Sequence, residues 1–148
     1  MGLSGTNLIY RKQFSEGIWQ NTETLASGLQ VITSMDTAYA GSNNVVAYTT
    51  KSNNNLSTVN DLKVFYFDGT QTLRITNDDN PDNSVSFLNN ELYWISGNSI
   101  VSITDGDLVS KTTVVENLEA SVSESKAIKN SNGKKAVVWE EENNSGMN

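Results

Sequence analysis

Short runs of β-branched and aromatic residues, separated by Gly, Asn, Asp and Ser, set the pattern of this chain. The clearest runs are NVVAYTT, LKVFYFDG, SVSFLNN, ELYWISG and NSIVSITDG. Runs of this kind bounded by turn residues predict β-strands. No window keeps apolar residues at the i, i+3, i+4, i+7 spacing of an amphipathic helix. LNNEL and TDGDL predict tight turns, because Asn and Gly tolerate positive φ. The pattern therefore predicts an all-β fold.

Three runs of this kind, VVAYTT, ELYWIS and AVVWEE, resemble one another. Their large aromatic residues, Tyr48, Trp94 and Trp139, lie 46 and 45 residues apart. Further predicted strands lie between them. A period in the mid-forties that contains four short antiparallel strands is typical of a β-propeller blade. Because the three aromatic residues recur at one position of the repeat, we expect them to pack between blades rather than to stack on a sugar.

The repeat divides the 148 residues into three blade equivalents. Blade one is predicted over residues 27–77, with strands at 37–40, 45–49, 62–67 and 72–76. Blade two is predicted over residues 78–118, with strands at 84–88, 92–95, 99–103 and 111–115. Residues 119–148 supply only a first and a second strand, at 125–129 and 136–140. Residues 1–26 supply the third and fourth strands, which begin near Leu8 and end near Leu25. One blade is thus predicted to be split between the two ends of the chain.

A split blade and a three-blade repeat together predict self-association. Propellers contain about 4 to 8 blades, because neighbouring twisted sheets must pack around an axis without a void. Two copies of three blades give a six-bladed ring with twofold symmetry, the commonest closed symmetry. Strands exchanged between the copies would cover exposed sheet edges. We therefore expect a homodimer with Trp139 at the join.

Composition narrows the classes of partner and chemistry. The net charge is −7, and only 10 Lys and Arg are present, which argues against nucleic acid and against anionic membrane surfaces. No apolar run approaches the roughly 20 residues of a membrane span, and MGLSGTNLIY lacks the apolar core of a secretory signal peptide. The chain has no His and no Cys. Ser-His-Asp and Cys-His catalysis and disulfides are therefore impossible within it.

Three segments, AVVWEEEN, TNLIYRKQFSEGIW and DLKVFYFDGTQTLRIT, resemble the blades of bacterial sialidase-like, BNR-type propellers. The resemblance implies a propeller fold and an extracellular or cell-surface location. The strict Asp-box S-x-D-x-G-x-T-W is absent, since YFDGTQTL keeps Asp68, Gly69 and Thr70 but lacks its Ser and Trp. A sialidase also needs an arginine cluster, and this chain has only Arg11 and Arg74.

Polar residues of the predicted interblade loops, with one aromatic residue that does not recur, form the candidate ligand-binding set. The set is Trp19, Asp36, Asp78, Asp79, Asp82 and Asn83. Alternate residues of DDNPDNS imitate the start of a calcium-binding EF-hand loop. Pro81 interrupts that loop, however, and Asn89 stands where the bidentate Glu should be. A solvated loop is the favoured interpretation over a calcium site, and no cofactor is predicted.

These observations favour a non-catalytic binding or scaffolding module. We expect a glycan or protein ligand at a ring face formed by the predicted loops 26–35, 51–60, 77–83 and 116–124. The alternative is a sialidase-type glycoside hydrolase whose site is assembled between chains or supplied by a larger parent protein.

Overall fold

The computed structural model describes residues 6–10, 13–19, 23–29, 32–40, 43–51, 62–104, 106–118 and 121–142. Every regular element among these residues is a β-strand, and none is a helix. The predicted all-β class is confirmed. Neighbouring strands in every sheet are antiparallel, and each sheet is built from strands close together in the sequence.

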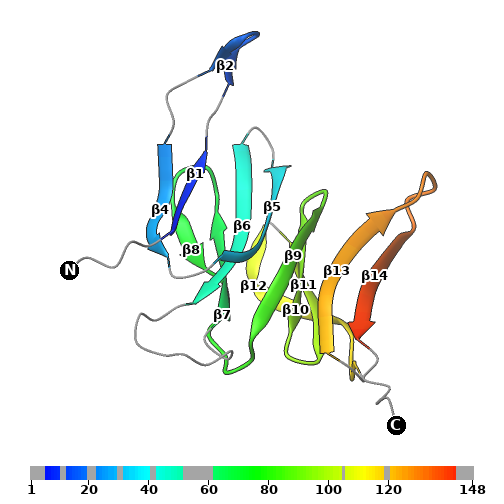
Figure 1. Cartoon of the computed structure of the whole chain (residues 1–148). Coiled ribbons are helices and arrows are strands. Elements are labelled where there is room, and N and C mark those ends of the chain that lie inside the picture. Colours follow the sequence, from blue (N-terminus) through cyan, green and yellow to red (C-terminus); the bar gives the residue numbers. More distant parts are fainter. Residues whose placement is uncertain are drawn as a thin grey trace.

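Two four-stranded sheets form the centre of the structure (Figure 1). The first sheet contains β5 (Ile32–Ala40), β6 (Asn43–Lys51), β7 (Leu62–Phe67) and β8 (Thr72–Arg74), in that order. The second sheet contains β9 (Asp82–Leu88), β10 (Glu91–Ser96), β11 (Ser99–Thr104) and β12 (Asp107–Val115), again in chain order. These are the strands predicted for blades one and two. The predicted LNNEL turn joins β9 to β10, with Asn89 at a φ of 56°.

Three strand pairs complete the described fold. The N-terminal pair consists of β1 (Thr6–Tyr10) and β4 (Glu23–Leu29). The terminal hairpin consists of β13 (Ser121–Lys129) and β14 (Lys135–Glu142). Both were predicted as half-blades. A small hairpin of β2 (Gln13–Ser15) and β3 (Ile18–Trp19) interrupts the N-terminal pair and was not predicted.

The sheets stand in an open row, and the described residues form no closed barrel or propeller. The first strands of the repeats, β5, β9 and β13, are neighbours in that order. The N-terminal pair and the terminal hairpin lie at opposite ends of the row (Figure 1). They therefore do not combine into one sheet within a single chain.

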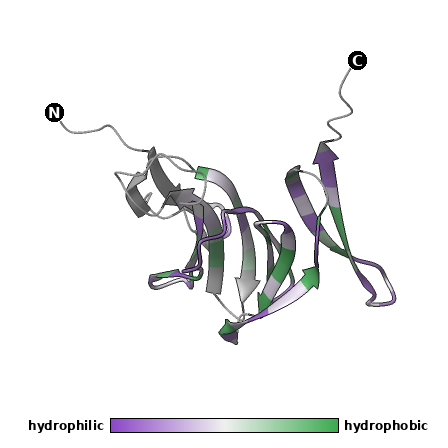
Figure 2. Ribbon diagram, turned by 90° about the horizontal axis from the view of Figure 1, so that it is seen from below, coloured by the Kyte–Doolittle hydropathy of each residue, from purple (hydrophilic) through white to green (hydrophobic). Residues whose placement is uncertain are grey.

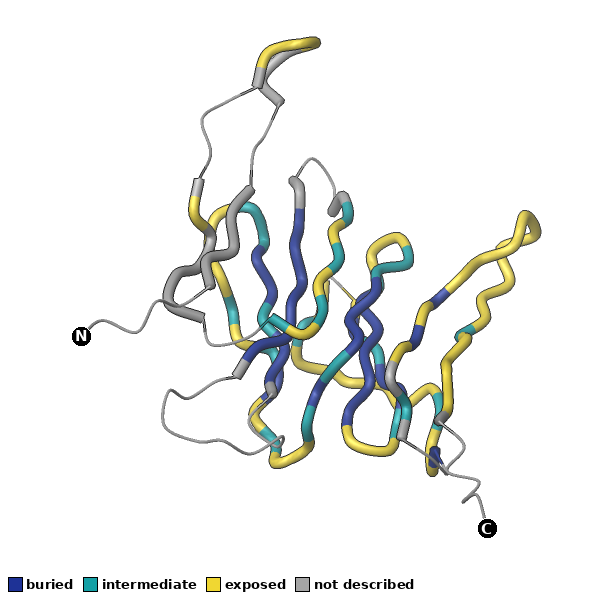
Figure 3. Tube along the Cα trace, in the orientation of Figure 1, coloured by how far each residue is buried: buried dark blue, intermediate teal, exposed yellow. Residues whose placement is uncertain are grey.

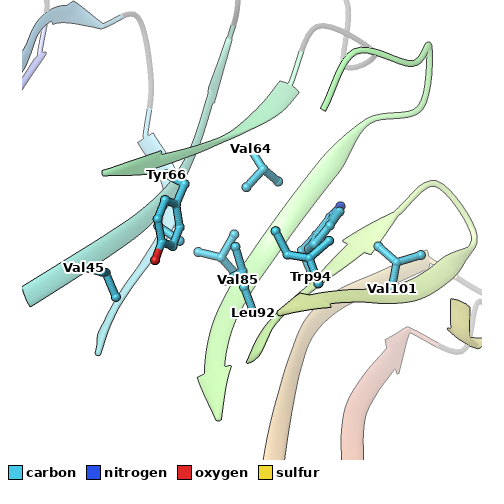
Figure 4. Close-up of a cluster of buried hydrophobic side chains, with 9 residues drawn as sticks. Val45, Val64, Tyr66, Val85, Leu92, Trp94 and Val101 are labelled. Atoms are coloured by element: carbon cyan, nitrogen blue, oxygen red, sulfur yellow. The ribbon is translucent and has the colours of Figure 1, made fainter. Parts of the chain in front are cut away.

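The main core lies between the first and second sheets (Figure 4). It consists of side chains from the facing sides of both sheets: Val45, Ala47, Val64, Tyr66, Val85, Leu92, Trp94, Val101 and Ile103. The opposite face of the second sheet packs on the terminal hairpin through Ile95 and Ile100. With Leu118, which follows β12, they meet Val122 and Val137. The first sheet thus packs face to face on the second, and the second on the terminal hairpin, because alternate residues of a strand point to opposite faces.

Candidate functional site: a polar pocket along the first strands

A pocket of about 420 Å³ is bounded by the three first strands β5, β9 and β13. Its lining is polar except for two apolar side chains and the stem of one lysine. The residues are Thr33, Ser34, Met35, Asp36, Asn83, Ser84, Val85, Ser86, Glu124, Ser125 and Lys126. These residues come from the middle of strands rather than from loops, so their backbone is fixed on one side by sheet pairing.

Side-chain oxygens, and not a backbone ladder, join the first strands to one another. Ser34 Oγ accepts the Val85 N–H at 3.1 Å, and Asp36 Oδ2 accepts the Phe87 N–H at 2.7 Å. The same arrangement recurs between β9 and β13. Ser84 Oγ accepts the Ser125 N–H at 2.7 Å, and Ser86 Oγ accepts the Ala127 N–H at 3.2 Å. Small polar residues at alternate positions therefore satisfy edge N–H groups that would otherwise be unpaired.

Two buried polar atoms of this pocket have no hydrogen-bond partner among the described residues. They are the Oδ1 atom of Asn83 and the Oγ atom of Ser125. Ser125 is only 4% exposed. Leaving such a group unpaired costs about 1–3 kcal/mol, so an orphan atom in a native protein calls for an explanation. A ligand or water in the pocket would supply the missing partners.

The charged groups of the pocket differ in how firmly they are held. Asp36 accepts the Thr37 N–H through Oδ1 at 2.8 Å, in addition to the bond from Phe87 to Oδ2. Its carboxylate is therefore fixed by the backbone on both oxygens. Glu124 and Lys126 lie on β13 and are exposed. They are the charged side chains of the pocket left available to a partner.

Asp82 lies beside the pocket but inside the second sheet. It is fully buried, and its Oδ1 accepts the indole N–H of Trp94 at 3.1 Å. Oδ2 has no well-formed hydrogen bond among the described residues. Burial raises the pKa of the Asp82 carboxyl, although the nearby hydroxyls of Thr76 and Ser96 oppose that shift. Asp82 is thus an interior group that positions Trp94.

Lysine side chains fasten the loop before β9. Lys63 Nζ donates to the backbone carbonyls of Asp78 and Asn80 at 2.6 and 2.8 Å, and Lys111 Nζ pairs with Asp78 Oδ2 at 2.8 Å. Burial disfavours ionisation of Asp78. The Lys111 hydrogen bond, the Asn80 N–H and the two lysine charges outweigh it and keep the pKa of that carboxyl below its usual value. A positive charge thus lies against two backbone carbonyls of this loop. Within the described ranges there is no group of three or more His, Cys, Asp or Glu placed to hold a metal ion.

The structure brings only part of the predicted ligand set together. Asp36 and Asn83 line the polar pocket. Asp78 lines a smaller pocket beside Trp94 instead, and Asp79 is exposed in the loop. Trp19 lies on β3, but its side chain is outside the described residues, as is most of the predicted loop 51–60.

The candidate set omitted nine residues of the pocket, although four of them lie in the predicted ring-face loops 26–35 and 116–124. The nine are Thr33, Ser34, Met35, Ser84, Val85, Ser86, Glu124, Ser125 and Lys126. A signal for two of them was present in the sequence. The segment SVS at 84–86 places two serines at alternate positions of a predicted first strand. Such spacing puts both hydroxyls on one side of a strand.

Comparisons with known proteins do not assign this chain to a family, because no family model, curated protein or solved structure matches it. Within the described part of the chain, no helix is long and apolar enough to cross a membrane. The inference of function therefore depends on the geometry of the pocket.

Proposed function

We propose that the chain consists of β-propeller blades and acts as a binding module, without catalysis, for a hydroxyl-rich ligand such as a sugar. Two features support the propeller architecture. Each complete repeat is a four-stranded antiparallel sheet, and the first strands of successive repeats are neighbours. Successive sheets also pack face to face, as the blades of a propeller do.

The observation that carries the binding role is the pair of buried, unpartnered atoms, Asn83 Oδ1 and Ser125 Oγ, in a polar pocket. A hydroxyl both donates and accepts, so one sugar ring can satisfy the amide oxygen and the serine hydroxyl together. A volume of about 420 Å³ lies within the range of about 300–1,000 Å³ found for small-molecule sites. The polar lining disfavours an apolar ligand.

The pocket offers little for a hydrolytic reaction. A paired-carboxylate glycosidase needs one acid that gives a proton and a second that acts as base or nucleophile. Both Asp36 oxygens are already bound to backbone N–H groups, which restricts that carboxylate to a structural role. Glu124 alone remains available, and the chain contains no histidine. The geometry therefore favours binding over turnover.

A glycan array combined with a panel of glycosidase substrates tests this function. We expect binding without turnover. Ser125→Ala should weaken binding about tenfold, the equivalent of one hydrogen bond of about 1.4 kcal/mol. Ser110→Ala is the matched control, because Ser110 is an exposed serine on β12, away from the pocket. Absence of binding, or equal binding by both variants, contradicts the proposal. Turnover abolished by Glu124→Gln would establish the glycoside hydrolase alternative instead.

A further inference from the structure

The same pattern of side-chain-to-backbone hydrogen bonds connects β5 to β9 and β9 to β13, and each such connection is called a join. At each join, two side chains two residues apart on one first strand accept the N–H groups of two residues, also two apart, on the next strand. The acceptors and their donors are Ser34/Asp36 with Val85/Phe87, and Ser84/Ser86 with Ser125/Ala127. Strand β9 donates N–H groups to β5 in the first join and accepts N–H groups from β13 in the second. The two joins therefore relate residues of all three repeats.

When the residues of the two joins are matched position by position, each first strand has two acceptor positions and two N–H donor positions. On β13, Glu124 and Lys126 take the acceptor positions that Ser84 and Ser86 hold on β9. On β5, Met35 and Thr37 take the donor positions that Val85 and Phe87 hold on β9. In sheet register, Met35 pairs with Tyr48 and Ser125 pairs with Trp139, so Tyr48 and Trp139 share one position of the repeat. Trp94 lies at the register irregularity between Tyr93 and Ile95. The two ends of the row therefore carry the two halves of one more join.

The exposed apolar residues fit this relation. Val85 and Ala47 belong to the same buried cluster between the first and second sheets, at 6% and 0% exposure. Their counterparts at the ends of the row are Met35 on β5 and Val138 on β14. These side chains are 61% and 50% exposed. The two apolar positions that are buried between the first and second sheets are therefore exposed at the two ends of the row.

The edges of β14 and β1 are complementary, because among the described strands each lacks the neighbouring strand that the other could supply. In both four-stranded sheets the second strand pairs with a third. Strand β14 is a second strand whose only described partner is β13, and β1 begins a pair with β4 alone. Because the N-terminal pair and the terminal hairpin lie at opposite ends of the row, β1 and β14 of one chain do not meet (Figure 1).

We propose that a second copy of this chain completes the row. The terminal hairpin of each copy packs beside β5 of the other copy and pairs with its β1, and a twofold axis relates the two identical joins. The product is a six-bladed ring in which the polar pocket of each copy forms part of a shared central channel. The inference rests on the blade architecture proposed above and does not depend on the ligand.

Charge complementarity supports a second copy as the occupant. Glu124 can accept the Met35 N–H of the other copy, as Ser84 accepts that of Ser125. Lys126 cannot accept a hydrogen bond. It does not need to, because the equivalent N–H, that of Thr37, is already bound by Asp36 Oδ1 at 2.8 Å. The ammonium group of Lys126 would instead meet the Asp36 carboxylate, which gives a charged pair at each join.

Light scattering after size exclusion at low micromolar concentration tests the assembly. We expect a mass of about 32 kDa, twice the 16.2 kDa of one chain. Lys126→Glu places a carboxylate against Asp36 and should weaken dimerisation at least about tenfold. Lys126→Arg should retain the dimer. Lys134→Glu, the same charge change in the turn of the terminal hairpin, is the control and should also remain dimeric.

A second pair of variants tests the apolar contact independently of charge pairing. Val138→Lys should produce a folded monomer. Val109→Lys makes the same change at a residue that is 91% exposed on β12 and should leave the dimer intact. Circular dichroism of each variant verifies the fold.

A wild-type chain that stays at 16 kDa throughout the micromolar range overturns the proposal. So does a mass that grows without limit as concentration rises, because that result indicates an open chain of copies rather than a closed ring. Equal dissociation by the Lys126 and Lys134 charge reversals would also overturn it. The mass is measured without ligand, so failure here is distinct from failure of glycan binding.

Discussion

Trp94 and Trp139 occupy the same position of the repeat, yet their surroundings differ completely. Trp94 on β10 is 0% exposed, and its indole N–H donates to the buried Asp82 carboxylate. Trp139 on β14 is 41% exposed, and its indole N–H donates at 2.8 Å to Glu141, two residues along the same strand. Strand β10 lies between two partners, whereas β14 pairs only with β13 among the strands that the structure describes. Burial in this architecture therefore comes from the neighbouring strands and not from the sequence of the strand itself.

The same contrast extends to whole strands. Strands β6, β7, β9 and β10 carry most of the buried residues, while the terminal hairpin is largely exposed (Figure 3). The hairpin nevertheless carries hydrophobic residues among its hydrophilic ones (Figure 2). Val138 and Trp139 are 50% and 41% exposed and lie on opposite faces of β14. We expect the proposed second copy to cover part of this exposed surface.

The largest expected effect comes from removing the two tryptophans in turn. Trp94→Ala should lower the free energy of unfolding by about 3–5 kcal/mol, because it leaves a cavity in the main core. Trp139→Ala should cost less than about 1 kcal/mol in the dilute monomer and should act mainly on dimerisation. Urea denaturation at low and high protein concentration measures both. Equal costs in the dilute protein would show that Trp139 is already buried within one chain.

A smaller difference in the free energy of unfolding is expected between alanine variants of two serines at the β9–β13 join. Ser84→Ala removes the acceptor of the Ser125 N–H and the donor to the Ser125 carbonyl, whose distance is 3.1 Å. We expect a loss of about 1–3 kcal/mol, because buried backbone groups become unsatisfied. Ser125→Ala removes an unpartnered hydroxyl and should leave stability unchanged or slightly higher. Thermal denaturation of both variants checks this, and a reversed order would contradict the assigned hydrogen bonds.

The pH dependence of stability should reveal the buried carboxyl beside Trp94. Because the pKa of Asp82 is raised on folding, the native state binds more protons than the unfolded state between the unfolded pKa, near 3.8, and the native pKa. Its contribution to stability therefore falls as pH rises through that window, by at most about 1.4 kcal/mol per pH unit. Asp82→Asn keeps an acceptor for Trp94 and does not titrate. Relative to wild type, the variant should gain stability from pH 4 to 8 in urea denaturation. A constant difference across this range would contradict the shift.

The smallest expected effect concerns the attachment of the terminal hairpin to the second sheet. Lys135 Nζ pairs with Glu91 Oε2 at 2.5 Å across that boundary, and this hydrogen bond, opposed by burial, lowers the pKa of the Glu91 carboxyl. Both side chains are partly exposed, so Lys135→Met should cost only about 0.2–1 kcal/mol. The effect should shrink in high salt, as chemical denaturation in 1 M NaCl would show. A salt-independent loss would assign the effect to packing of the lysine stem.

Local patterns were sufficient to predict most strands. Alternating apolar residues with Asn and Gly between them marked the two four-stranded sheets, and Asn89 marked the turn between β9 and β10. The hairpin of β2 and β3 was missed, because three- and two-residue strands are too short to show any period. Its turn has Gly17 at a φ of 75°, in the region that glycine tolerates best.

The pocket was harder to predict, because its geometry depends on residues far apart in the sequence. Ser34 meets Val85, and Ser84 meets Ser125, across 51 and 41 residues. Polar residues between the apolar runs suggested solvated loops, but Asp36 lies within β5, and Asp82 and Asn83 lie within β9. Asp82 looked equally suited to a ligand, but it is fully buried and bonded to Trp94 on the next strand.

Amide hydrogen exchange over β14, compared with β10 in the same protein, tests the central claim most directly. The claim is that a second copy gives the terminal hairpin the environment that the second sheet already has. At concentrations that favour the dimer, the backbone amides of Lys135–Glu142 should approach the protection of Glu91–Ser96. Dilution should remove that protection from β14 while β10 stays protected. Rapid exchange of β14 at every concentration would contradict the account.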